Sequence, residues 1–390
     1  MRRSDERIMV THSGSLPRSQ DLARLYGARS RGEDVSETEL EELGRQAQHA
    51  SVRRQLAVGV DIGNDGEARR ESYFTFVQNR LSGFGGSWER PPTADADRYP
   101  LYARAYRRFI GAIEGVTNIT GVPMAVGPVR HVTSRPIEDE CAQLRACLDG
   151  ATEGAFTEAF MTAPSPGIVV AAMKNAHYAS DMEYLAAVGA AMRVEYETIV
   201  DNGFVLQLDC PDLALERHRT YKDRSLSEFL AFASSVVRTI NEAIENIPRD
   251  RVRMHVCWGN YEGPHDCDLE LEAIVPVLRE ADVGGFVLPF ANPRHAHEHK
   301  VLSDWKPDDD QIVVAGVIDT QTNYVEHPEG VADRLVRIAE SLGDPTRVLA
   351  GTDCGFESAA GGGRVADDVV WAKLSALSDG ARIASTRLFG

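Results

Sequence analysis

Short runs of apolar and β-branched residues recur along the chain, mostly separated by stretches in which apolar residues have helical spacing. Eight such runs end in polar or small residues, and they span 8–17, 58–67, 160–167, 204–212, 252–260, 284–293, 312–320 and 348–356. Helices are predicted over 36–59, 180–203 and 328–344, each ending near a glycine. Alternating strands and helices are typical of parallel βαβ units. The pattern predicts an α/β fold, and eight units favour a closed (β/α)8 TIM barrel.

An open, doubly wound sheet is the alternative architecture. The glycines of "GNDGE" at 63–67 do not follow the dinucleotide-binding spacing, so no nucleotide site is indicated. We expect a single domain over 1–390, with residues 85–150 as an elaboration on the barrel face that includes a hairpin within 116–132. Residues 357–368, rich in glycine and alanine, are expected to form a mobile loop after the last strand.

Charge and hydropathy exclude some classes of partner. The net charge of −17, from 42 basic and 59 acidic residues, argues against binding to nucleic acid. No stretch approaches the roughly 20 apolar residues of a membrane helix, so no membrane partner is expected. The first residues lack a signal-peptide core, and six cysteines are too few for a disulfide scaffold. We therefore expect a reduced, cytoplasmic protein, and whether it forms a homo-oligomer stays open.

Polar residues gather where the predicted strands end, which in a barrel is the face that forms the active site. They are Asp65, Glu67, Asp209, Asp212, His255, Cys257, Asp319, Asp353 and Cys354. In a strand, His255 and Cys257 point to the same side because side chains alternate. A closed barrel brings Cys354 near them. Two thiolates and one imidazole suit Zn²⁺, and three protein ligands with an open fourth position are typical of a catalytic zinc.

Five motifs in order resemble the cobalamin-independent methionine synthase superfamily, specifically its zinc-bearing C-terminal barrel. They are "THSGSLPR" (11–18), "DGEARRESYF" (65–74), "LQLDCPDLAL" (206–215), "HVC" (255–257) and "DCG" (353–355). The segments "HVCWGNYEGPH" and "ANPRHAHEH" look closest to a stand-alone branch similar to epoxyalkane:coenzyme M transferase. The resemblance implies a (β/α)8 barrel of the UROD/methionine-synthase-like type.

The resemblance also implies roles for individual residues. His255, Cys257 and Cys354 match zinc ligands, Ser15 matches a serine that contacts the thiol substrate, and Glu67 and Asp209 match carboxylates that face an amino acid substrate. Two positions depart from methionine synthase. Pro289 stands where a glutamate ligand is expected, which leaves water, the substrate thiol or His295 as the fourth ligand. Gln321 replaces the proposed proton-donating histidine, and a glutamine is no general acid.

The leading hypothesis is a zinc-dependent thiol S-alkyltransferase, in which a small-molecule thiol attacks a methyl donor, an epoxide or a similar small electrophile. Asp319 and Asp353 are candidate acids for the leaving group, as are Tyr324 and His327. Arg18 is available for an anionic thiol, and Trp258 for the pocket wall. A zinc lyase or hydrolase that uses metal-bound water is the second hypothesis. A non-catalytic, zinc-stabilised accessory protein is the third. The histidines of "RHAHEHK" (294–300) are expected on a solvated helix face.

Overall fold

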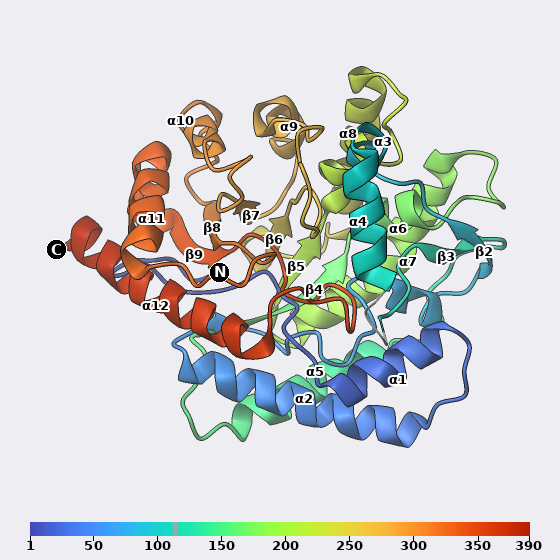
Figure 1. Cartoon of the computed structure of the whole chain (residues 1–390), viewed down its shortest axis with the longest axis horizontal. Coiled ribbons are helices and arrows are strands. Elements are labelled where there is room, and N and C mark those ends of the chain that lie inside the picture. The colour runs from blue at the N-terminus through green and yellow to red at the C-terminus, as the bar shows by residue number, and fades with distance from the viewer. Residues whose placement is uncertain (112–115) are drawn as a thin grey trace.

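A curled, parallel sheet forms the centre of the protein, whose structure is a computed structural model that describes residues 1–111 and 116–390 (Figure 1). Side chains are described for 1–109 and 116–390. The sheet has seven strands in the order β1-β4-β5-β6-β7-β8-β9, and all neighbouring pairs are parallel. The strands are β1 (Ile62–Gly63), β4 (Glu158–Pro164), β5 (Val205–Asp209), β6 (Val252–His255), β7 (Gly285–Pro289), β8 (Ile312–Ile318) and β9 (Val348–Thr352). Six of them lie within a predicted run and β4 begins two residues before its run, so these strand predictions are confirmed.

The remaining predicted run, at 8–17, links the two edges of this sheet. The carbonyl oxygen of Val10 accepts hydrogen bonds from the backbone N–H groups of Asp61 and Ile62, next to and within β1. On the other side, Thr11 N–H donates to the carbonyl of Ala350 in β9, and Ala350 N–H donates to Met9. Residues 9–11 therefore lie between β9 and β1, and the sheet curls until its first and last strands share this segment.

Helices surround the strands (Figure 1). Serine side chains cap several of the helices at their start. Ser36, Ser180 and Ser225 each accept a hydrogen bond from a backbone N–H of the helix that they precede. The helices predicted over 36–59, 180–203 and 328–344 are confirmed as α2, α7 and α11. The bounds are α1 (Gln20–Ser30), α2 (Glu37–Ala57), α3 (Ala94–Arg98), α4 (Pro100–Gly111), α5 (Arg135–Asp149), α6 (Pro166–Ala172), α7 (Asp181–Asp201), α8 (Leu226–Ala243), α9 (Leu271–Leu278), α10 (Val301–Trp305), α11 (Pro328–Leu342) and α12 (Asp367–Phe389).

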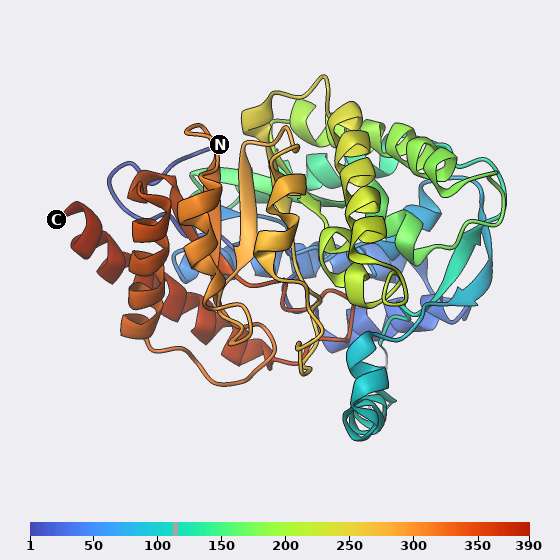
Figure 2. The same ribbon diagram turned by 90° about the horizontal axis from the view of Figure 1, so that it is seen from above.

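Part of the segment 85–150 forms a second, two-stranded sheet. Its strands β2 (Phe84–Glu89) and β3 (Gly121–Ala125) are antiparallel. The predicted hairpin within 116–132 is therefore wrong, because β3 pairs with a strand more than thirty residues upstream. Helices α3 and α4 lie between these strands in the sequence and project from the body of the molecule (Figure 2). Residues 112–115 of this segment lie outside the described residues.

The segment 357–368, predicted as a mobile loop, makes backbone contacts with the loop that follows β1. Tyr73 N–H donates to the carbonyl of Ser358, and Ala360 N–H donates to Glu71. Its last two residues begin α12. The mobility of this segment stays a prediction.

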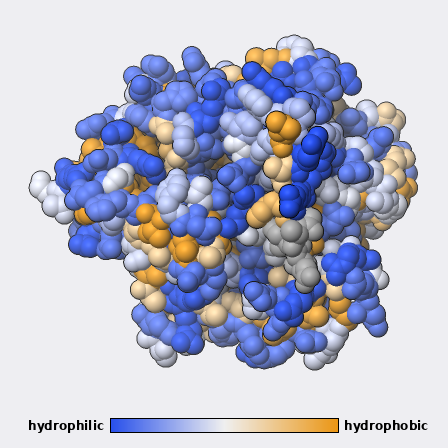
Figure 3. Space-filling view, viewed as in Figure 1, coloured by the Kyte–Doolittle hydropathy of each residue, from blue (hydrophilic) through white to orange (hydrophobic). Residues whose placement is uncertain are grey.

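The surface in the view of Figure 1 is mostly hydrophilic, with hydrophobic residues in separated patches (Figure 3). Within 1–111 and 116–390, none of the helices is both long and apolar enough to cross a membrane. Two large side chains pack against each other in the interior of the curled sheet. The guanidinium of Arg253 lies 3.8 Å from the ring centroid of Phe160, and both residues are buried. This layer forms a floor beneath the carboxyl ends of the strands.

Candidate metal centre and cavity

A cavity of about 910 Å³ opens at the carboxyl ends of the central strands. Its inner wall comes from strand-end loops and includes Ser15, Glu67, Asp209, His255, Cys257 and Cys354. Its outer wall comes from the elaboration, with Tyr102 and Tyr106 of α4 and the loop residues 90–93 and 116–120. The projecting α3–α4 segment therefore covers the strand ends, which leaves a deep space rather than an open face.

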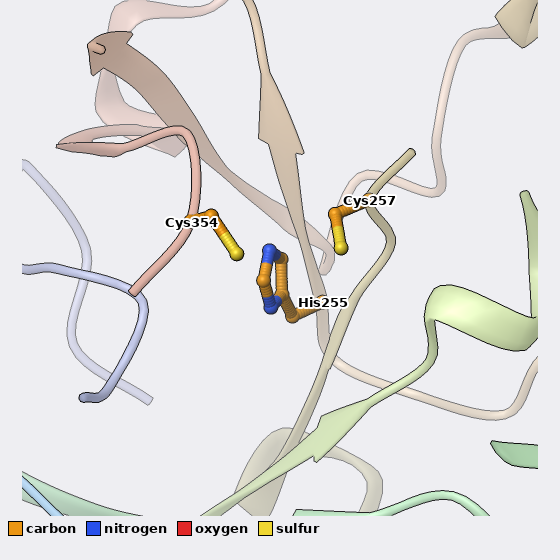
Figure 4. Close-up of side chains that lie close together, drawn as sticks. All are labelled: His255, Cys257 and Cys354. Carbon is orange, nitrogen blue, oxygen red and sulfur yellow. The ribbon is translucent and has the colours of Figure 1, made fainter. Parts of the chain in front are cut away.

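Three potential metal ligands, two soft sulfurs and one borderline nitrogen, meet in the wall of this cavity. The imidazole of His255 and the sulfur atoms of Cys257 and Cys354 all lie within 4.8 Å of one another. Figure 4 shows the three side chains pointing toward one another. His255 is the last residue of β6 and Cys257 lies just beyond that strand, while Cys354 follows β9. We predicted that strand alternation positions Cys257 beside His255. This is wrong, because β6 ends at His255 and the turn after it positions Cys257.

A line of hydrogen bonds connects this group to the floor of the barrel. His255 Nδ1 donates to Asp209 Oδ1 at 3.1 Å, and the two residues are register partners on β6 and β5. The same oxygen accepts from the side-chain amide of Gln207 at 2.9 Å, and Gln207 in turn accepts from Arg253 at 2.9 Å. Because Asp209 faces Nδ1, the ring nitrogen left for a metal is Nε2, which lies 3.3 Å from the carbonyl oxygen of Asp353.

The two thiols behave as a coupled pair. A hydrogen bond from the Cys354 thiol, opposed by burial and aided by His255, lowers the pKa of Cys257 to about 7. The same hydrogen bond and burial raise the pKa of Cys354 well above its usual value. Burial would lower the pKa of His255, but the hydrogen bond to Asp209 and the charge of Cys257 raise it to about 9. Cys257 and His255 thus each favour the charged form of the other.

Glu67 is a buried carboxylate that faces the cavity in a constrained conformation. Its backbone lies in the left-handed region at φ +56°. One oxygen accepts from the Thr162 hydroxyl at 3.0 Å, whereas Oε2 has no partner among the described residues. Burial and the negative charge of Asp209 raise the pKa of Glu67 to about 7. A Cβ at Gly14, where φ is +126°, would lie 2.6 Å from Glu67 Oε1, so glycine is needed there.

The other predicted substrate contacts divide between the cavity and its support. Ser15 lines the cavity. Arg18 is buried behind it, and its guanidinium donates to the carbonyl groups of Glu67 and Glu357. Trp258 donates from its indole N–H to the Leu269 carbonyl and packs against His295 in a tilted arrangement, with 4.4 Å between ring centroids. The described lining of the cavity includes neither Arg18 nor Trp258.

Asp319 and Asp353, the predicted acids, point into loop backbone. Both oxygens of Asp353 accept backbone N–H groups from residues 290–292, at 2.7–3.0 Å. Burial raises the pKa of Asp353 to about 7. Asp319 accepts from Gln321 N–H and from the Thr322 hydroxyl. Neither appears in the described lining of the cavity.

The two departures from methionine synthase have distinct surroundings. Pro289 ends β7 opposite Gly316 and offers no side-chain ligand. Gln321 donates to the side chain of Asn260, which lines the cavity. His295, considered as a replacement ligand, is directed elsewhere: its two ring nitrogens face Asp268 and Glu298. It is also buried, so the predicted solvated helix face is wrong for this residue, although His297 is exposed.

The cavity wall also contains arginines that sequence reasoning missed, among them Arg90 and Arg219. Arg90 is paired with the buried Glu216. Burial, with the nearby charge of Arg90, lowers the pKa of Arg219 to about 10. Because both arginines lie in segments without any motif, no sequence signal marked them. Arg219 adds positive charge to the cavity wall, whereas the charge of Arg90 is balanced by Glu216.

No protein-family model matches the chain. It is 23% identical over 353 residues to the methionine synthase of Sulfurisphaera tokodaii, which covers 90% of this chain and 86% of the relative. It is also 23% identical over 384 residues to the methionine synthase of Saccharolobus solfataricus, with 98% and 96% covered.

Among solved structures, a B12-independent methionine synthase from Shewanella sp. W3-18-1, in complex with selenomethionine, aligns with a TM-score of 0.75. The identity is 20%, and the alignment covers 98% of this chain and 99% of that one. The chain therefore shares its overall fold with this protein and resembles methionine synthases in sequence over most of its length.

Proposed function

We propose that the protein is a zinc-dependent thiol S-alkyltransferase, in the coarsest terms a methyltransferase that acts on a small thiol. The observation on which this depends is the convergence of His255, Cys257 and Cys354 in the wall of a deep cavity. Similarity to methionine synthases supports methyl transfer to a thiol. The donor set fits zinc, because two sulfurs and one nitrogen are ligands that Zn²⁺ prefers.

We further propose that residues 9–11 act as the eighth strand of a (β/α)8 barrel over 1–390, with 85–150 as its elaboration. The hydrogen bonds from residues 9–11 to β9 and to the start of β1 support this closure. Closure matters for function because it brings Cys354 and His255 from distant strands to one point. It also brings the loop that carries Ser15 over the same point.

Each residue of the inner wall then has a defined task. Bound Zn²⁺ supplies the positive charge that lets a substrate thiol lose its proton at neutral pH. Asp209 orients His255 through Nδ1–H and, through Gln207, stays fixed to Arg253. Glu67 presents its unpartnered oxygen to an ammonium group, which favours an amino-bearing thiol such as homocysteine. Ser15 contacts the polar end of this substrate.

The remaining wall suits the alkyl donor. In the reaction, the substrate sulfur forms a bond to carbon while the bond from that carbon to its leaving atom breaks, and the leaving atom takes a proton. Arg219 offers positive charge to an anionic donor, and Tyr102 and Tyr106 offer flat apolar surfaces. The hydrogen bonds of Asp353 favour a positioning role, in which it holds residues 290–292 beside its neighbour Cys354.

The test is a methyl-transfer assay on the zinc-loaded protein. Homocysteine and coenzyme M serve as competing thiols, and methyl-folates, S-methylmethionine and a short epoxide serve as donors. We expect a thioether product that requires both zinc and thiol, with homocysteine preferred. Zinc-edge absorption spectra should gain a sulfur neighbour when the thiol is added. Turnover of a substrate without any thiol would instead support the lyase or hydrolase hypothesis and contradict this proposal.

A further inference from the structure

A second polar cluster lies beyond the cavity wall, built from the loops that follow β5, β6 and β7. It consists of His218, His265, Asp268 and His295, and we call it the histidine–aspartate cluster. All four residues are at most 8% exposed. The described lining of the cavity includes none of them, so the cluster has no part in the alkyl transfer proposed above.

Two of the histidines have their outer nitrogens committed as donors. His265 Nε2 faces the carbonyl oxygen of Tyr261 at 3.0 Å, and His295 Nδ1 faces Glu298 Oε2 at 2.8 Å. A carbonyl oxygen accepts only, as does a carboxylate, so each of these nitrogens carries the hydrogen. In a neutral imidazole, the other nitrogen is then a bare lone pair.

Both inner nitrogens point at the same carboxylate oxygen. His265 Nδ1 lies 2.7 Å and His295 Nε2 lies 2.8 Å from Asp268 Oδ2. Two bare lone pairs cannot face an anionic oxygen at this distance without a positive charge between them. The junction therefore needs two extra protons, or one divalent cation, and either choice adds the same charge.

We propose that a divalent cation, and not two extra protons, supplies this charge. His265, Asp268 and His295 then bind a divalent transition metal of the zinc class. Their ligand atoms lie within 4.8 Å of one another. Two imidazoles and a carboxylate are a common ligand set for such metals. A histidine ligand whose outer N–H donates to a carboxylate or a backbone carbonyl is the usual arrangement around a metal, and both histidines have it.

The surroundings of Asp268 add an independent indication. Its second oxygen, Oδ1, lies 3.2 Å from His218 Nε2. Neither nitrogen of this buried histidine has a well-formed hydrogen bond within the described residues, and Oδ1 of the buried Asp95 nearby also lacks one. Ligand atoms of Asp95, His218 and Asp268 again lie within 4.8 Å of one another. Unpartnered polar atoms at such depth are costly, and a bound cation would relieve them.

The metal would be structural and would secure one wall of the cavity. His265 and Asp268 belong to the loop after β6, which also contributes Asn260 and Tyr261 to the cavity. His265 itself adopts a left-handed backbone at φ +55°, which a non-glycine residue keeps only when its surroundings hold it. Tyr261 donates to Asp95 of α3 at 2.7 Å, so the site also ties the projecting segment to the barrel.

The experiment measures metal content after loading with Zn²⁺ or Co²⁺ and removal of unbound metal. We expect two ions per wild-type chain, one in the Cys257→Ser/Cys354→Ser double variant and one in His295→Gln. His297→Gln is the matched control, because His297 is exposed and lies in the same segment, three residues before Lys300. This variant should retain two ions. In the double variant, the metal-edge spectrum should show nitrogen and oxygen neighbours without sulfur.

The outcomes separate this site from the proposed active site. A wild-type chain with one ion that the double cysteine variant loses would overturn the inference and leave the proposed function intact. One ion that survives in the double cysteine variant would support the inference and contradict the zinc-dependent function. If His295→Gln fails to fold, the spectrum of the double cysteine variant still decides, and imidazolium signals from His265 and His295 in that zinc-treated variant would refute metal binding.

Discussion

The Cys–His site of the cavity and the histidine–aspartate cluster are neighbours with opposite character. Both depend on the loop after β6, and Trp258 lies between them, next to Cys257 in the chain and packed against His295. The first offers sulfur ligands to an open cavity, whereas the second offers nitrogen and oxygen ligands away from it. Catalytic metals keep an accessible position and structural metals are enclosed. Access, more than the number of ligands, thus distinguishes the two regions.

The largest expected difference between the two regions appears when one ligand is removed from each. Cys354→Ser should lower the rate of alkyl transfer by at least about a hundred-fold. Loss of a metal ligand has a larger effect than loss of a residue that only orients a ligand. His295→Gln should lower activity only a few-fold but reduce the melting temperature more. Activity and thermal unfolding are measured on both variants. Equal losses of activity would contradict the division into an open and a closed site.

A smaller effect is expected from Asp209→Asn, which weakens the orientation of His255 without removing a ligand. Metal affinity should fall by about 10- to 100-fold. Competition with a chromogenic chelator measures this change. Asp201→Asn, at the exposed end of α7, is the matched control and should leave affinity unchanged. An unchanged affinity in Asp209→Asn would mean that His255 does not need this partner.

Glu67 should impose a pH dependence that the closed cluster does not share. The pKa of this carboxyl is raised from 4.5 to about 7, so its ionised form prevails above pH 7. Binding of an amino-bearing thiol should therefore strengthen as pH rises through about 7, and Glu67→Gln should abolish that dependence. The KM for homocysteine, measured from about pH 6 to about pH 8, one unit on either side of this pKa, checks the expectation.

The same group has a consequence for stability, with a definite sign. Because the folded-state pKa lies above the unfolded value, the stability that it contributes is complete below about 4.5 and is lost as pH rises through 7. Glu67→Gln should then stabilise the metal-free protein at pH 8, by at most about 3 kcal/mol. Urea unfolding at pH 5 and pH 8 measures the difference. A variant less stable than wild type at pH 8 would contradict the raised pKa.

The smallest effect is expected from Trp258→Phe. The substitution removes the hydrogen bond to Leu269 and leaves an aromatic ring beside His295. Stability should fall by about 1 kcal/mol. The described cavity lining does not include Trp258, so KM for both substrates should stay within about two-fold. A two-fold change corresponds to a smaller free energy than the loss of one hydrogen bond. A larger change in KM would restore Trp258 as a substrate contact.

Much of this architecture follows from local sequence. The run 312–320 contains β8, and all of its strand residues are buried because a parallel strand is covered on both faces. Serine caps mark the starts of α2 and α7. The convergence of His255, Cys257 and Cys354 was predicted from their places at strand ends together with the resemblance to a zinc-bearing barrel. These features depend on neighbours within a few residues or on the regular pattern of βαβ units.

Tertiary structure decided which polar groups face the cavity and which face protein. Arg219 entered the cavity wall, Trp258 and Asp353 turned toward loop backbone, and His295 was buried although its segment is polar. Each outcome depends on partners far along the chain, such as Asp268 for His295 and residues 290–292 for Asp353. A polar residue type shows that a hydrogen bond is needed, but only packing of distant loops supplies the partner and sets the depth.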